Sequence, residues 1–169
     1  MAESGGDPYK TSIPATLFFE VVVKIIAFDI GANFAWAVNH PKVAWHSIEL
    51  KGIRAHRQQQ LLNYLESLSW VKKLDAAIYE TPIAVGQSAK RSLWGIAGII
   101  EATISNHGLP VMDVPANTIK LFTTGRGNAA KVDMIAAAQR MGYKGNNEHE
   151  ADAFCLLKYA EANMERVKS

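Results

Sequence analysis

The sequence predicts a single α/β domain whose mixed five-stranded sheet is flanked by helices, and two observations predict this class. Apolar stretches of strand length alternate along the chain with stretches of helical periodicity. The first three strand-like stretches follow one another through short connections, which is typical of antiparallel pairing, whereas helical stretches separate the later strands, which is typical of parallel pairing. A length of 169 residues is enough for one domain with a full hydrophobic core.

The N-terminal segment differs in composition from the rest of the chain. It is rich in Gly, Ser, Pro and charged side chains, so we expect residues 1–20 to be a disordered tail before a single folded domain over residues 21–165. The apolar stretch over residues 16–30 is too short for a membrane span and is interrupted by Glu20 and Lys24. It also lacks the basic start of a secretory signal, and we expect no membrane partner.

Composition sets only broad limits on function. Hydrophobic residues make up 49% of the chain, charged residues 20%, and the formal net charge is +2. Such a weakly basic balance does not by itself indicate nucleic-acid binding, so the placement of the charges has to decide. The single Cys155 excludes an internal disulfide and a zinc site with several cysteines, and it fits a reducing, cytosol-like compartment.

The first three strands are predicted from apolar and alternating stretches. They cover Lys24 to Ile30, Asn33 to Asn39 and Val43 to Leu50, with a turn at His40-Pro41-Lys42 between the last two. The first of them is apolar at nearly every position, which is typical of a strand buried on both faces. We therefore expect an antiparallel meander whose first strand lies inside the sheet.

The sequence after residue 54 predicts two more strands and five helices. The strands are predicted over Asp75 to Tyr79 and Leu109 to Val114, and the helices over residues 55–74, 86–107, 115–122, 129–141 and 148–164. Asn128 is the predicted N-cap of the fourth helix. Residues 123–127 and 142–147 are predicted loops.

Asp29 is the first candidate for chemistry. It lies inside the apolar run that ends at Gly31, where a carboxylate is costly unless a cation or a hydrogen-bond donor faces it. Gly31 permits a sharp turn and the close approach of a ligand. Two interpretations remain open on this stretch alone: Asp29 is a metal ligand, or it only caps the end of the strand.

Three further polar side chains lie at comparable places. Glu80 follows the fourth strand, and His149 and Asp152, three residues apart, project from one face at the start of the last helix. Neighbouring strands lie about 4.8 Å apart, so side chains at their ends can share a cation. Each residue alone also fits a solvated strand end or helix start, but together with Asp29 they favour a Mg²⁺ or Mn²⁺ site. Two such ions can activate water and stabilise the leaving oxygen of a phosphodiester.

Positive charge accumulates between the last two acidic motifs. The segment from Pro82 to Lys131 contains five cationic and two acidic residues, so its net charge is 5 − 2 = +3. The cations are Lys90, Arg91, Lys120, Arg126 and Lys131. The last three flank a Gly-rich loop whose backbone amides can approach phosphates. An ordinary basic surface loop is the alternative interpretation.

Four motifs together resemble the RuvC family of Holliday junction resolvases. They are Phe28-Asp29-Ile30-Gly31, Tyr79-Glu80, the segment from Pro115 to Lys131, and His149-Glu150-Ala151-Asp152-Ala153. The resemblance extends from about Lys24 to Tyr159, and its Gly-rich loop and last helix are most similar to phage-type members. It implies the RNase H-like fold of that family.

The resemblance also implies roles for individual residues. Asp29, Glu80 and Asp152 match the metal-binding carboxylates of the family, and His149 stands where many members have another Asp. Lys120 and Lys131 match basic residues near the cleaved backbone.

The activity implied by the resemblance is that of a homodimeric endonuclease. It binds four-way DNA junctions and nicks two strands with Mg²⁺, for which Mn²⁺ substitutes, two ions per active site, leaving 5′-phosphate and 3′-hydroxyl ends. We expect Lys131 to act in catalysis and also to bind DNA, together with Lys90, Arg91, Lys120 and Arg126. The expected location is the cytoplasm of a bacterial cell or phage-infected host. The alternatives are an RNase H-fold nuclease for other branched DNA or RNA, and a non-catalytic junction-binding protein.

A dimer surface is predicted on the helix over residues 86–107. Gly95, Gly98 and Ala102 lie near one face of this helix, which is apolar nearly all round. Close packing of two copies across these small residues would place two active sites on one junction. A fully buried core helix is the alternative interpretation.

Overall fold

The computed structural model describes residues 22–164, so the predicted tail over residues 1–20 lies outside the described residues. Its centre is a five-stranded sheet with the strand order β3-β2-β1-β4-β5. The strands are β1 (Ile25–Asp29), β2 (Asn33–Val38), β3 (Ala44–Glu49), β4 (Ala76–Glu80) and β5 (Val111–Val114). β1 pairs antiparallel with β2 and parallel with β4, so the predicted mixed sheet with a β-meander is confirmed.

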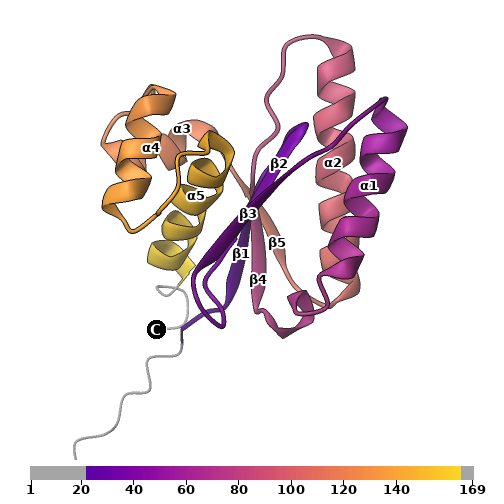
Figure 1. The fold of residues 1–169 in the computed structure, drawn as a ribbon, viewed down its shortest axis with the longest axis horizontal. Helices are drawn as coiled ribbons and strands as arrows, with labels where there is room; N and C mark the ends of the chain where they lie inside the picture. The colour runs from indigo at the N-terminus through magenta and orange to yellow at the C-terminus, as the bar shows by residue number, and fades with distance from the viewer. Residues whose placement is uncertain (1–21, 165–169) are drawn as a thin grey trace, which may run out of the picture.

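Helices cover both faces of this sheet (Figure 1). They are α1 (Arg54–Ser67), α2 (Gln87–Asn106), α3 (Ala116–Thr124), α4 (Lys131–Arg140) and α5 (Glu148–Met164), with a 3₁₀ turn η1 (Val71–Lys73) after α1. α1 and α2 lie on one face, and α3, α4 and α5 lie on the other. The architecture has three layers, with the sheet in the middle.

β1 is buried on both faces, which explains its continuous apolar sequence. Ile25 and Ala27 belong to the core beneath α5, whereas Ile26 and Phe28 belong to the core beneath α1 and α2. All four side chains are fully buried. Because successive side chains of a strand point to opposite faces, a strand between two helical layers needs apolar residues at every position.

Two predicted helix ends are wrong, one because of a tertiary contact and one because of a local signal. The helix predicted over residues 55–74 ends at Ser67, because the chain then turns to pack Trp70 on Trp36 of β2, with 5.3 Å between ring centroids. The helix predicted to end at Phe122 continues to Thr124 and is terminated by Gly125 in the left-handed conformation (φ 76°).

The predicted N-cap of α4 is also wrong. Ala130 precedes the helix in place of Asn128, and the Asp133 carboxylate accepts a hydrogen bond from the Ala130 backbone N–H at 3.3 Å. Ala129 is buried in the core beneath α5, and Ala130 after it has an extended backbone, so the helix begins only at Lys131. The Ala130 backbone N–H at the helix start therefore has a hydrogen-bond acceptor within the first turn of the same helix.

Candidate active site

Two parallel strands bring Asp29 and Glu80 to the same edge of the sheet. Each is the last residue of its strand, and Phe28 of β1 is in register with Tyr79 of β4 just before them. The carboxyl ends of adjacent parallel strands meet at one edge. Asp152 reaches this edge from the second turn of α5, which packs across β1.

Glu80 and Asp152 are partly buried and repel neighbouring carboxylates. Burial, and then the charges of Asp29 and Asp152, raise the pKa of Glu80 to about 7, opposed by Lys120. Burial, and then the charge of Asp29, raise the pKa of Asp152 to about 7, opposed by His149 and two lysines. The three carboxylates therefore repel one another, and this edge of the sheet carries excess negative charge.

A small cavity opens beside these carboxylates. Its volume is about 200 Å³, and Glu80, Asp152, Lys120 and Lys131 contribute its polar lining. α3 and α4 supply the two lysines, so the helices of one layer place cations opposite the acidic edge of the sheet. Such a cavity combines anionic groups that suit a cation with ammonium groups that suit a phosphate.

His149 is bonded to Asp29. Its Nδ1 lies 2.8 Å from Oδ2 of Asp29, and its Nε2 lies 3.5 Å from the Glu148 carboxylate. The hydrogen bond to Asp29, which exceeds the opposing effect of burial, raises the pKa of His149. The direct carboxylate partner therefore favours the protonated imidazole, although the start of a helix disfavours positive charge.

The donor set fits a divalent cation in its chemistry. Three carboxylates offer hard oxygen ligands of the kind that Mg²⁺ and Mn²⁺ prefer, and a cation would neutralise the repulsion between them. Within residues 22–164, however, no three His, Cys, Asp or Glu side chains are gathered closely enough to hold an ion as they stand. Asp29 instead uses its carboxylate to bind His149.

The remaining predicted DNA contacts are distributed unevenly. Lys131 is paired with Glu148 at 2.7 Å, and Arg126 is paired with Asp133 at 2.9 Å at the start of α4. Lys90 and Arg91 are exposed on α2, which lies on the opposite face of the sheet, and neither lines the cavity. The structure thus brings Lys120 and Lys131 to the carboxylates and leaves the other three cations on surrounding surfaces.

Sequence reasoning missed the residues that fix the start of α5. The Asn147 side-chain oxygen accepts hydrogen bonds from the backbone N–H groups of His149 (2.9 Å) and Glu150 (3.2 Å). Glu150 in turn accepts from Ser47 at 2.8 Å and from Tyr143 at 3.0 Å. An Asn before an acidic helix start is a recognisable cap signal, and here it orients the helix that carries His149 and Asp152.

The raised pKa of Asp152 predicts a stability gain on neutralisation. In the folded metal-free protein this pKa is about 7, whereas an unfolded Asp titrates near its ordinary value of about 3.9, so the folded state loses stability as the pH rises between these values. We expect Asp152→Asn to raise the free energy of unfolding by about 1–3 kcal/mol at pH 8. Thermal melts in a chelator measure this gain in stability, which should become smaller toward pH 4. A gain that is independent of pH would contradict the electrostatic explanation.

The architecture defines the class of fold: an α/β domain of the RNase H-like type, with a mixed five-stranded sheet between helical layers. The solved structure of RuvC from Thermus thermophilus has a TM-score of 0.67 at 14% identity, covering 86% of this chain and 96% of that one. The structure titled "T. thermophilus RuvC in complex with Holliday junction substrate" also has a TM-score of 0.67, at 18% identity, covering 83% and 96%.

These two comparisons show a shared fold at low identity. No protein-family model matches the sequence, and no curated protein matches it. None of the helices within residues 22–164 combines the length and apolarity that a bilayer span requires.

Proposed function

We propose that this protein is a Mg²⁺-dependent endonuclease that resolves four-way DNA junctions by paired nicks. One observation carries the proposal: in an RNase H-like fold, Glu80 and Asp152 line a cavity together with Lys120 and Lys131, and both carboxylates interact with the charge of Asp29. A solved structure with this fold is that of RuvC in complex with a Holliday junction substrate, which supports the choice of DNA. We expect it to act in the cytoplasm of a bacterial cell or phage-infected host.

In this mechanism the three carboxylates hold the metal, and two ions per site are expected. When bound, Mg²⁺, or Mn²⁺ in its place, would supply Lewis-acid activation of water and charge neutralisation for hydrolysis of the phosphodiester to 5′-phosphate and 3′-hydroxyl ends. Lys120 and Lys131 face the acidic cavity and stabilise charge on the phosphate. His149 fixes the orientation of the Asp29 carboxylate through its Nδ1 contact.

The test is a panel of labelled substrates in Mg²⁺. A synthetic four-way junction should be converted into nicked duplexes, with cuts in opposed strands, faster than forks, flaps, linear duplex or RNA. Preference for another branched DNA or for RNA would leave a nuclease but overturn the junction assignment. Tight junction binding without cleavage in Mg²⁺ or Mn²⁺ would favour the non-catalytic alternative.

Paired cutting requires two active sites, and we propose that α2 forms the dimer surface. Its outer row contains Trp94, which is 53% exposed, and Gly98 and Ala102, both exposed, at four-residue spacing. The alternative of a fully buried helix does not hold, because only one side of α2 lies in the core. Gly95 does not belong to the outer row: a Cβ there would collide with Gln58 of α1, so it serves the α1–α2 contact.

Gly98→Arg is expected to give a folded monomer. A Cβ at this position meets nothing within 4 Å, so the fold accommodates a side chain, while a bulky cation opposes its own copy across a two-fold axis. Sedimentation should show a dimer for the wild type and a monomer for the variant, with paired cuts largely replaced by single nicks. Glu101→Gln, also exposed on α2, is the matched control; a wild-type monomer that still makes paired cuts contradicts the proposal.

A further inference from the structure

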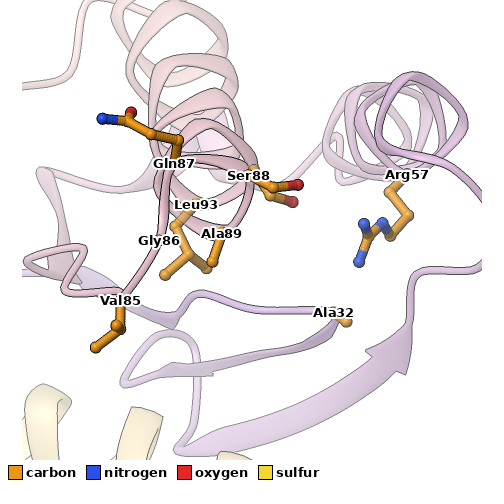
Figure 2. A pocket seen from close by; sticks show the side chains of 9 residues that line it. Ala32, Arg57, Val85, Gly86, Gln87, Ser88, Ala89 and Leu93 are labelled. Atoms are coloured by element: carbon orange, nitrogen blue, oxygen red, sulfur yellow. The ribbon is translucent and has the colours of Figure 1, made fainter.

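A second and larger cavity lies between α1 and the start of α2. Its volume is about 650 Å³, and its lining includes Ala32 from the loop after β1, Arg57 from α1, and Ser88 and Ser92 from α2. Figure 2 shows Arg57 and Ser88 pointing toward one another across this space, with Ala32 beneath them. We call this cavity the Arg57 groove. Among residues 22–164, no acidic side chain lines it.

Arg57 is the main reason to infer a ligand. Its Nε is fully buried and has no hydrogen-bond partner within the described part of the chain. No ion pair found among residues 22–164 involves its guanidinium. A buried donor without a partner is costly, and a planar guanidinium beside open space suits a phosphate or carboxylate that accepts two hydrogen bonds. The Arg57 groove therefore holds an unneutralised cation.

Neutral donors surround this cation. The hydroxyls of Ser88 and Ser92 lie in the lining. Within the described part of the chain, no side chain caps the first turn of α2, which leaves its backbone amides at Gln87 to Ala89 as hydrogen-bond donors. The chain enters α2 through Gly86, whose φ of 88° favours glycine. A phosphate in the groove would receive hydrogen bonds from both helices and from the guanidinium.

The location and rim favour a nucleic-acid phosphate over a small anion. Ala32 lies three residues after Asp29, so the groove begins at the sheet edge that carries the carboxylates. Val85 at its rim is 98% exposed and nearby Ile83 is 74% exposed, which offers apolar surface to a sugar or base. A backbone strand that passes the carboxylates would continue along this groove.

We propose that the Arg57 groove binds a backbone phosphate of the DNA substrate, separate from the phosphate that is cleaved. This inference rests on the proposed function, because it assigns the groove to the same substrate. It names Arg57 as an anchor that the sequence alone did not single out. The groove binds a phosphodiester through charge and hydrogen bonds, so it contributes affinity on any sequence.

The test compares Arg57→Gln with the matched control Arg54→Gln, which changes an exposed arginine at the start of α1 that does not line the groove. Junction affinity is measured in a chelator, without cleavage, over a series of salt concentrations. We expect Arg57→Gln to weaken binding about tenfold and to lower the salt slope by about one unit. Arg54→Gln should match the wild type, and thermal melts verify that both variants fold.

The outcomes separate the inference from the function on which it rests. Equal affinities and slopes for both variants, with a wild type that binds junctions, overturn the Arg57 groove alone. A wild type that binds no branched DNA overturns the proposed function itself. A second experiment uses inorganic phosphate as the probe in thermal melts. If phosphate stabilises the wild type but not Arg57→Gln, and the substitution leaves DNA affinity unchanged, the groove binds a small anion. The assignment of the groove to DNA is then wrong.

Discussion

Replacing Asp29 by Asn should abolish junction cleavage while preserving junction binding. The amide is nearly isosteric and its oxygen still accepts the hydrogen bond from His149, which lies 2.8 Å away, so the site keeps its shape. It loses the anionic ligand, and metal-assisted hydrolysis should fall by at least on the order of 10²-fold. Affinity should hold or increase, because one negative charge that repels phosphates is removed.

Single-turnover cleavage in Mg²⁺ and binding in a chelator measure the two effects on one labelled junction. Asp75→Asn is the matched control, since Asp75 accepts a hydrogen bond from the Lys24 backbone at 2.8 Å at the opposite end of the sheet. It should cleave at the wild-type rate. Wild-type cleavage by Asp29→Asn would refute the assignment of the carboxylate site.

Lys131→Ala should slow the chemical step far more than it weakens binding. Lys131 lines the cavity of Glu80 and Asp152, where its ammonium group can meet charge that develops on the phosphate. A contact of this kind acts mainly in the transition state, and its loss commonly costs on the order of 10²-fold in rate. The measurement is the single-turnover rate at saturating junction, alongside the dissociation constant.

Two further variants show whether the effect of Lys131→Ala is specific to the ammonium group at this place. Lys144→Ala removes an exposed lysine from the loop before α5 and should leave the rate unchanged. Glu148→Gln breaks the 2.7 Å ion pair with Lys131 and should lower the rate only a few fold, since exposed ion pairs contribute little to placement. If Lys131→Ala weakens binding tenfold at an unchanged rate, the lysine only contacts the DNA backbone.

Local patterns in the sequence were enough to predict the order and type of the elements and the sheet edge at which the candidate site lies. Side-chain periodicity is local, so a run of apolar residues such as Ile25 to Phe28 identifies a strand buried on both faces without knowledge of its neighbours. Asp29 and Glu80 were identifiable because each ends such a run, and parallel strands end at one edge. The class of fold was therefore readable before any contact was known.

The contacts between distant residues, in contrast, depend on how the elements pack in three dimensions. Asp29 and His149 are 120 positions apart, and their bond, which raises the pKa of His149, depends on how α5 docks on β1. Gly95 resembled a dimer contact in the helical pattern, yet Gln58 of α1 occupies the space beside it. Arg57 looked like an ordinary polar position of a helix until α2 closed a groove against it. Burial, charge interaction and cavities depend on distances between segments far apart in the chain, and periodicity carries no information about those distances.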